Sequence, residues 1–440
     1  MGSLFVWLAI DALSLGGCIL WLRRRLSFFH PAFYYLFFHL YVITIPAWQV
    51  YLGGSVMYEG MSGYMAIRPD EFARAIAYAD LALSMFSVGT LLGPRIAFAW
   101  KARPRGTGYV LSGRLTVLLL AILLPFSLYF FAARRSGLEA ESLLVASGYG
   151  TTFALWPFAC LIMGLFRFGF RWFLVAPLEI LLPIVGLQGY LRFSFVLTLL
   201  FVASVYVYRT GRRWPPVWAW PVAIAIVLLF PQMKYIGKAV QEDDLSGAAR
   251  RVEQALFLAP PDTELIIEKQ MLDPYAGALT LADGLGKRYF GRTYLPLLTF
   301  PIPRFLWPHK PGFGDHVIAM ATRSRPYDRE GRTITYIAEA YLNFGIAGVI
   351  LVPLVFGVVL SRAYRIFRSG PPGRVGQLFY LSIMVSLIQA YRDGLNSIVV
   401  FGIIHMFPIV IAWALHVMTQ RGKCKFSLAQ LGNESHPRRL

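Results

Sequence analysis

The sequence predicts an all-α polytopic membrane protein with about eleven transmembrane helices. Of its 440 residues, 57% are hydrophobic and only 15% are charged. Apolar runs long enough to cross a hydrocarbon layer of ~30 Å recur along the whole chain. A transmembrane β-barrel would instead alternate polar and apolar residues. The distribution of basic residues adds an orientation, with the N-terminus outside and the C-terminus in the cytoplasm.

Basic residues gather in alternate connections between the apolar runs. The formal net charge is +19, and nearly all of the basic excess falls in a few short segments. These are residues 23–25, 95–114, 167–171, 209–213, 362–374 and the C-terminal tail. Cytoplasmic loops of membrane proteins carry such an excess. The charge therefore does not indicate nucleic acid as a partner, and the partner expected from it is the lipid bilayer.

The apolar runs divide the chain into four parts. The predicted spans lie near residues 3–22, 31–52, 74–92, 115–132, 150–166, 172–189, 192–208, 216–233, 338–360, 376–391 and 397–418. Residues 1–233 form an N-terminal bundle of about eight spans, and residues 234–336 form a large outer loop. Residues 337–418 hold the last three spans, and residues 419–440 form a basic cytoplasmic tail.

The large outer loop is the first place to look for chemistry. Short helices are expected in it at residues 245–258 and 262–272, the first of them amphipathic. Its later part, within residues 298–345, is rich in proline, aromatic residues and arginine. Proline removes a backbone donor and restricts the preceding residue, so a regular helix is excluded there. Irregular backbone at a membrane surface persists only where protein or a watery cavity satisfies it.

Three acidic residues fall inside predicted spans, where ionisable groups are costly and indicate function by default. Asp11 and Asp80 lie in the outer halves of their spans, and for them a structural, helix-pairing role is the favoured interpretation. Glu179 lies between Pro177 and Pro183, which break the helical hydrogen-bond ladder, and there structural and functional roles are equally favoured.

Three arginines are predicted where spans meet the outer surface. They are Arg192, Arg304 and Arg392. Each one taken alone is explained by snorkelling to lipid headgroups or by pairing with a carboxylate such as Glu339. Taken together, three guanidiniums in one outer cavity would bind a pyrophosphate through bidentate hydrogen bonds, with Lys310 as a further cation.

Two residues are candidates for a general base. Glu339 enters apolar surroundings at the start of the ninth span, where burial raises the pKa of a carboxyl unless a cation pairs with it. An arginine partner is the structural alternative. His309 lies in the proline-rich part of the loop. Either residue could take a proton from a sugar hydroxyl, whereas an ordinary solvated loop residue is the alternative for the histidine.

Two segments of the chain resemble a known family. The segment FPIPRFLWPHKP is followed by ITYIAEAYLNFGIAGVI, which contains Glu339, Tyr341, Asn343, Phe344 and Gly345. They resemble the Wzy-type O-antigen and exopolysaccharide repeat-unit polymerases, which carry such segments in a large periplasmic loop and at the start of the next span. The arginines at positions 192 and 392 are also similar to outer-face arginines of that family.

The resemblance implies a fold similar to the membrane-embedded GT-C glycosyltransferases, in the bacterial inner membrane with a periplasmic active face. It implies that undecaprenyl-diphosphate-linked oligosaccharides are polymerised by inverting transfer without a metal or another cofactor. The sequence agrees in having no evident acidic triad or histidine cluster outside. Residues then expected to contact sugars or the acceptor are Trp307, Tyr336, Tyr341, Asn343, Arg323 and Arg325. A flippase and a chain-length regulator are the implied protein partners.

Two other functions remain open from the sequence. An O-antigen ligase, which transfers polymer to lipid A-core, would share the many spans, the large loop and the outer arginines. A lipid-linked oligosaccharide flippase or a proton-coupled transporter is the candidate from a different class. A carrier of that kind typically has matching halves with broken helices at midplane, and the sequence has no such repeat.

Overall fold

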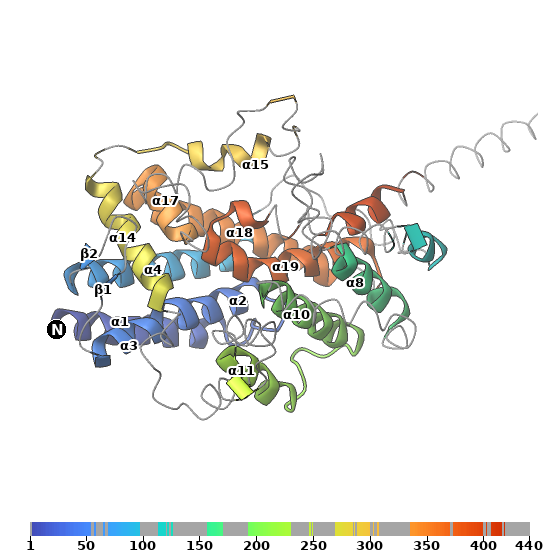
Figure 1. Cartoon of the computed structure of the whole chain (residues 1–440), viewed down its shortest axis with the longest axis horizontal. Helices are drawn as coiled ribbons and strands as arrows, with labels where there is room; N and C mark the ends of the chain where they lie inside the picture. Colours follow the sequence, from blue (N-terminus) through green and yellow to red (C-terminus); the bar gives the residue numbers. More distant parts are fainter. Residues whose placement is uncertain are drawn as a thin grey trace, which may run out of the picture.

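The computed structural model describes residues 2–53, 57–58, 65–66, 69–96, 113–119, 121–122, 125, 156–169, 192–229, 246–247, 249, 269–284, 286, 288–299, 302, 306–307, 335–369, 373–398, 402, 406–415 and 418. These residues form a bundle of helices (Figure 1). The N-terminus, the strand pair β1–β2, α14 and α17 gather at one end of it, here called the N-terminal end (Figure 1).

The first helices run back and forth along the bundle. α1 (Gly2–Leu22) is followed by α2 (Pro31–Phe38), the π-helix η1 (His39–Thr44) and α3 (Ile45–Gly53). The last three continue one another without a break. Pro46 explains the wide turn of η1, because proline lacks an N–H and crowds the preceding helical turn.

α4 (Pro69–Leu92) packs against α1 and begins with acidic residues in its first turn, which suit the positive end of the helix dipole. Between α3 and α4, the two-residue strands β1 (Met57–Tyr58) and β2 (Met65–Ala66) pair antiparallel. Met57 lies opposite Ala66 in this pair, and Tyr58 lies opposite Met65. Apart from this pair, the regular elements that the structure describes are helical, as the sequence predicts.

The middle of the chain contributes helices on two sides of the bundle. α8 (Trp156–Phe168) packs against α10 (Arg192–Arg209), and α10 packs against α19 (Val375–Asp393). α11 (Ala219–Leu229) follows α10 in the chain. These helices lie away from the N-terminal end (Figure 1).

The outer loop of the prediction supplies three described elements. α14 (Lys269–Gly284) packs on α4, and the 3-10 helix η6 (Arg292–Tyr294) leads directly into α15 (Leu295–Thr299). The helix predicted at residues 262–272 overlaps α14 at residues 269–272, and residues 262–268 lie outside the described residues. α14 continues past the predicted end to Gly284. Its burial against α4 extends it beyond the stretch that local sequence indicates. The helix predicted at residues 245–258 lies almost wholly outside the described residues.

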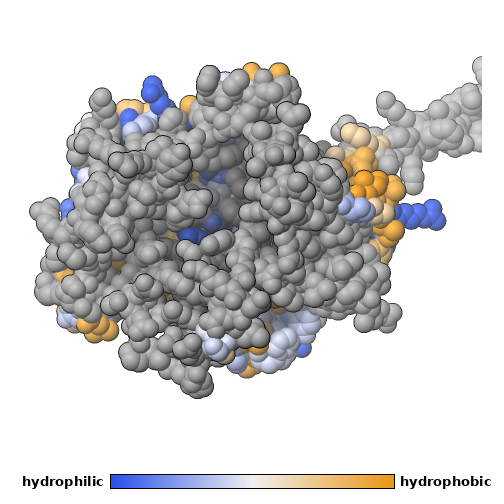
Figure 2. All heavy atoms as spheres, in the orientation of Figure 1, coloured by the Kyte–Doolittle hydropathy of each residue, from blue (hydrophilic) through white to orange (hydrophobic). Residues whose placement is uncertain are grey.

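Three helices in the described part of the chain are long and apolar enough to cross a membrane. They are Leu4–Leu22, Asp70–Leu92 and Ile346–Ser369. Large apolar side chains are exposed around them, including Leu13, Leu20 and Val355, and hydrophobic patches reach the surface at several places (Figure 2). The predicted class of helical membrane protein is confirmed to this extent. The count of eleven spans and their orientation stay predictions.

The ninth span predicted at residues 338–360 is wrong as a single helix. α17 (Tyr336–Phe344) and α18 (Ile346–Ser369) are separated at Gly345, whose φ of 63° favours glycine. α17 then lies back along α18. A Cβ at Gly348 would collide with the carbonyl oxygen of Ala340, and the rings of Tyr336 and Phe356 are 6.1 Å apart. The sequence predicts one long helix instead of a hairpin, because the apolar run does not reveal the turn at Gly345.

Glycines bring α4 and α18 into very close contact. A Cβ on Gly89 would meet the carbonyl oxygen of Leu354, and one on Gly357 would meet the carbonyl oxygen of Phe86. Small residues at such positions let two backbones approach, which is a common way for helices to associate in a membrane. This contact joins the two halves of the chain through the two longest apolar helices among the described residues.

Arginine side chains bind backbone carbonyls in the last turn of α8 and in the connection after α1. Arg213 donates from Nε to the carbonyl oxygen of Leu26 at 2.7 Å and from Nη2 to that of Arg24 at 2.8 Å. Arg209 donates to the carbonyl oxygen of Phe166 at 2.9 Å. A cation is stabilising where terminal carbonyls lack a helical partner. Some residues of the basic excess therefore also hold the bundle together.

A cluster of buried aromatic rings connects α17 to the bundle. The ring of Tyr35 stacks on Phe86 at 4.3 Å between centroids and lies 4.9 Å from that of Tyr391. The hydroxyl of Tyr336 donates to the Tyr35 hydroxyl at 2.6 Å. These rings are buried, so α17 begins inside the protein and brings its polar residues with it.

Candidate functional site

Glu339 lies on α17 in the interior of the molecule. Thr335 caps the helix, accepting a hydrogen bond from the backbone N–H of Ala338 at 3.2 Å. One turn later the Glu339 side chain faces η6 and the turn after α19, and the residue is only 2% exposed. The hairpin at Gly345 makes this enclosure possible, because it packs both faces of α17 against protein.

The Glu339 carboxylate joins three segments that are far apart in the chain. Its Oε1 accepts hydrogen bonds from the Thr293 hydroxyl at 3.0 Å and from Nδ2 of Asn396 at 3.3 Å. Its Oε2 accepts from the backbone N–H of Leu395 at 3.0 Å. No cationic side chain forms an ion pair with it within the described residues. The partners shown are thus a hydroxyl, an amide and a backbone N–H rather than the expected arginine.

Asn343 completes the cluster one turn further along α17. Its Nδ2 donates to the Thr293 hydroxyl at 2.6 Å and to the carbonyl oxygen of Glu339 at 2.8 Å. Its Oδ1 accepts from the backbone N–H of Gly291 at 2.8 Å. Asn396 donates in addition to the carbonyl oxygen of Thr293 at 3.0 Å. The amide of Asn343 therefore has both polar atoms engaged, as a buried amide requires.

Burial decides the protonation of Glu339. α17 lies outside the three candidate spans. Removal from water raises the pKa of the carboxyl to about 7, and the hydrogen bonds from Leu395 and Thr293 oppose that rise. The group can therefore hold or release a proton close to neutral pH, which is a property required of a general acid or base.

The two predicted tyrosines lie in different environments. Tyr336 is fully buried in the aromatic cluster, so it holds α17 in place and does not face an open surface. Tyr341 donates its hydroxyl to Oδ1 of Asp283, and burial together with that bond raises the pKa of its phenol to about 12. Arg288 lies over the Tyr341 ring at 4.6 Å.

A network of charges on α14 and α4 surrounds Tyr341. Asp283 accepts from Nη1 of Arg74 at 2.6 Å and from Nη2 of Arg288 at 3.4 Å. All three side chains are partly exposed. The sequence does not predict a functional role for Arg74 or Arg288, because arginines are common in loops and in the first turns of helices. Only the fold shows that they share one carboxylate.

The structure describes two of the three predicted arginines in part. Arg392 is half-buried in the last turn of α19, three residues before the Leu395 N–H that binds Glu339. Arg192 begins α10. Trp307 is described by its exposure, which is 41%. The role of Arg392 in binding pyrophosphate stays a prediction.

Several predicted site residues lie outside the described residues. They are Arg304, His309, Lys310, Arg323, Arg325 and, within the spans, Glu179. Their roles stay predictions. Thr293 and Asn396 were missed by sequence reasoning. A threonine and an asparagine in short turns carry no periodic signal, and their pairing with Glu339 follows only from the fold.

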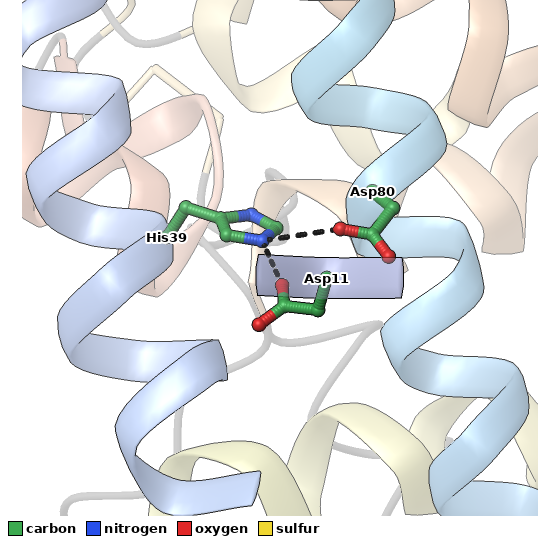
Figure 3. A group of neighbouring side chains, drawn as sticks. All are labelled: Asp11, His39 and Asp80. Carbon is green, nitrogen blue, oxygen red and sulfur yellow. Dashed lines mark hydrogen bonds and ion pairs between the residues drawn. The ribbon is translucent and has the colours of Figure 1, made fainter. Parts of the chain in front are cut away.

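The other buried carboxylates do occupy the helix-pairing positions that the sequence favours. Asp11 of α1 and Asp80 of α4 both lie beside the imidazole of His39 in η1 (Figure 3). This triad uses helices different from those of the Glu339 cluster.

The bundle and its polar cluster define a helical membrane protein with an ionisable carboxyl enclosed between α17, η6 and the turn after α19. Comparison with known families narrows the class. The family described as O-antigen polysaccharide polymerase Wzy matches residues 316–421, which include α17, α18, α19 and the turn at residues 394–396. The resemblance expected from the sequence is thereby confirmed over this part of the chain. No curated protein and no solved structure matches.

Proposed function

We propose that this protein polymerises lipid-linked oligosaccharide repeat units by glycosyl transfer in the membrane. The observation that carries the proposal is the family match over residues 316–421, because this range contains both Glu339 and the turn that binds its carboxylate. The match favours a polymerase over the ligase and the carrier that the sequence left open.

The proposed substrate is an undecaprenyl-diphosphate-linked oligosaccharide, used on the periplasmic face of the inner membrane. A hydroxyl of the acceptor unit attacks the anomeric carbon of the donor sugar. The bond between that carbon and the pyrophosphate oxygen breaks, the configuration inverts, and the pyrophosphate leaves with the lipid. The acceptor proton passes to a base. No metal is required in this scheme, because cationic side chains neutralise the leaving group.

Arg192, Arg304 and Arg392, with Lys310, are the proposed grip on the pyrophosphate. Guanidinium groups bind such oxygens through paired hydrogen bonds and stabilise charge that develops as the bond breaks. Support comes from Arg392, which lies on the last turn of α19 just ahead of the Glu339-bound residues. If the turn at residues 394–396 is fixed, the preceding Arg392 is also positioned for binding the pyrophosphate.

Glu339 has two roles open to it at this site, as base or as positioning residue. The three donors around its carboxylate favour positioning, since they fix residues 395 and 396 relative to η6. A pKa of about 7 favours proton transfer. We propose that Glu339 positions the turn and that His309 is the base. Trp307, Tyr341, Arg323 and Arg325 are proposed to contact sugars, while Tyr336 and Asn343 support α17.

The test uses purified full-length protein in liposomes with labelled lipid-linked repeat units. A polymerase yields a ladder of longer glycans on the lipid. Transfer only to added lipid A-core would indicate a ligase, and movement of unchanged substrate across the bilayer would indicate a carrier. Either of these two outcomes would overturn the proposal.

Variants divide the proposed roles. Arg392→Ala and Arg304→Ala should lower the turnover about 10²–10³-fold, as expected when a group that stabilises transition-state charge is lost. The matched control is Arg365→Ala. In the wild-type protein, Arg365 donates to the carbonyl oxygen of Pro94 at 2.6 Å and takes no part in the Glu339 cluster. His309→Ala should abolish the dependence of turnover on pH, whereas Glu339→Gln should lower turnover and keep that dependence. The reverse pattern would make Glu339 the base.

A further inference from the structure

Three buried ionisable side chains meet in the middle of the N-terminal helices (Figure 3). Asp11 comes from α1, His39 is the first residue of η1, and Asp80 comes from α4. Nε2 of His39 is 2.7 Å from Oδ1 of Asp11 and 3.5 Å from Oδ1 of Asp80. One ligand atom from each residue lies within 4.8 Å of the other two.

The charges of this triad do not balance. Asp11 and His39 are 0% exposed and Asp80 is 6% exposed. Within the described residues, His39 is the only cationic partner of either carboxylate. With both carboxylates ionised, one imidazolium leaves a net charge of about −1 in a dry interior. Such a charge is costly unless a further cation compensates it. A divalent ion bound to the neutral imidazole, which gives up its proton, brings the net charge to zero.

Oxygen atoms in the triad also lack hydrogen-bond partners. Both carboxylate oxygens of Asp80 and Oδ2 of Asp11 are buried without one in the described structure. Oδ1 of Asp80 faces the imidazole nitrogen that already bonds Asp11 (Figure 3). Buried carboxylate oxygens normally accept hydrogen bonds or bind a metal. The unpartnered oxygens therefore point to a cation that these three residues would share.

We propose that Asp11, His39 and Asp80 bind one divalent transition-metal ion, with Zn²⁺ as the best match. One imidazole nitrogen and two carboxylate oxygens form a donor set typical of zinc. Bonds of ~2.1 Å in a tetrahedral arrangement place ligand atoms about 3.4 Å apart. The separation from His39 to Asp80 already has this value, and that from His39 to Asp11 needs to open by well under 1 Å to reach it.

The fold explains how this site is assembled. The π-helical turn ahead of Pro46 ends the regular α-helix at Phe38 and places His39 at the start of the widened stretch. Wide turns of this kind often occur at functional sites. The ion would join α1, η1 and α4 in the half of the chain that the family match does not cover. It is a structural site, separate from the proposed transfer chemistry and independent of it.

The first experiment measures metal in the purified full-length protein. An affinity tag without histidine is used, and metal content is measured by mass spectrometry after dialysis against a weak chelator. About one zinc ion per chain is expected to remain. Replacement by Co²⁺ should give visible absorption bands typical of a four-coordinate site with nitrogen and oxygen ligands. Background metal content, with no such bands after Co²⁺ addition, would overturn the proposal.

Matched variants test which residues hold the ion. Asp80→Asn and His39→Gln should each weaken retention of Zn²⁺ roughly 100-fold or more. Asp70→Asn is the control, because it makes the same substitution at an exposed position on the same helix. Equal retention in all three variants would place the metal elsewhere and reject the site.

A measurement on the wild-type protein guards against variants that fail to fold. Long incubation with a strong chelator should lower the midpoint of thermal unfolding by several degrees, and added Zn²⁺ should restore it, because an ion that binds only the folded state stabilises it. If a proton alone compensates the triad, neither treatment shifts the midpoint, and the metal site is rejected.

Discussion

Glu339 shows how one buried side chain can hold distant segments in register. Its two oxygens accept from Thr293, Leu395 and Asn396, so α17, η6 and the turn after α19 meet at a single carboxylate. Removing one member would leave buried donors unpaired, which costs about 1–3 kcal/mol for each group.

The pKa of Glu339 gives a prediction about stability. The carboxyl has an ordinary pKa of 4.5 and a folded-state pKa of about 7, so the folded protein binds the proton more tightly. The stabilisation is fully present below pH 4.5 and is lost as pH rises through 7. We expect the free energy of unfolding to fall by up to about 3 kcal/mol over this range. Thermal unfolding in detergent at several pH values measures it.

The Glu339→Gln variant isolates this contribution. Glutamine cannot ionise, so the variant should lose most of the fall in stability between pH 4.5 and pH 7. Glu71→Gln on the first turn of α4 is the matched control, because it makes the same substitution outside the Glu339 cluster. A Glu339→Gln protein whose stability falls with pH as steeply as the wild type would contradict the assignment.

Sequence reasoning found Glu339 but not its partners. A carboxylate beside an apolar run is conspicuous, because burial of charge is costly. Thr293 lies 46 residues before it and Asn396 lies 57 residues after it. Nothing in their local sequence distinguishes them from other turn residues. Residues that matter by pairing at long range become visible only once the fold has brought them together.

At the scale of elements, the α17–α18 hairpin is the main difference from the sequence prediction. Only Gly345 separates α17 from the long apolar α18, so a single span is predicted there. Gly345 adopts a positive φ and Gly348 lies against the backbone of Ala340, which together reverse the chain. A glycine next to a long apolar run has many uses, and the sequence alone does not identify this one.

The contact between α4 and α18 gives a second prediction. Gly357→Leu places a side chain where the carbonyl oxygen of Phe86 lies, and should destabilise the protein by about 1–3 kcal/mol or more. Gly376→Ala on α19 meets no atom within 4 Å and should be neutral or stabilising by up to about 1 kcal/mol. Thermal unfolding of both variants compares them. Equal stability would show that α4 and α18 do not pack closely at Gly357.

At the scale of the whole molecule, composition and charge predict the class well. In the described part of the chain, three apolar helices are long enough to span a membrane, and Arg209 and Arg213 bind backbone carbonyls of other segments. The length of the apolar runs and the excess of basic residues in loops each depend on many residues, so a prediction of the class from them does not depend on any single residue. The number of spans depends on each boundary, and element boundaries are harder to predict from sequence than the existence of a long apolar helix.

The orientation of the chain can be tested by cysteine labelling in intact cells. Cys18, Cys160 and Cys424 are first replaced, and one cysteine is then introduced. At Leu298, which is 78% exposed on α15, it should react with a membrane-impermeant maleimide. At Thr210, after α10, it should react only once the membrane is permeabilised. Labelling of the cysteine at position 210 in intact cells, with or without labelling at position 298, would contradict the predicted orientation.

The hydrogen bonds of Asn343 and Glu339 to η6 have a consequence for exchanging segments between relatives. The family match begins at residue 316, yet Gly291 and Thr293, which complete the cluster, precede it. A chimera joined at the start of the match would combine one parent's carboxylate with the other parent's donors. The smallest segment that can be transplanted intact therefore begins before Tyr289, whose N–H already bonds the carbonyl oxygen of Leu342.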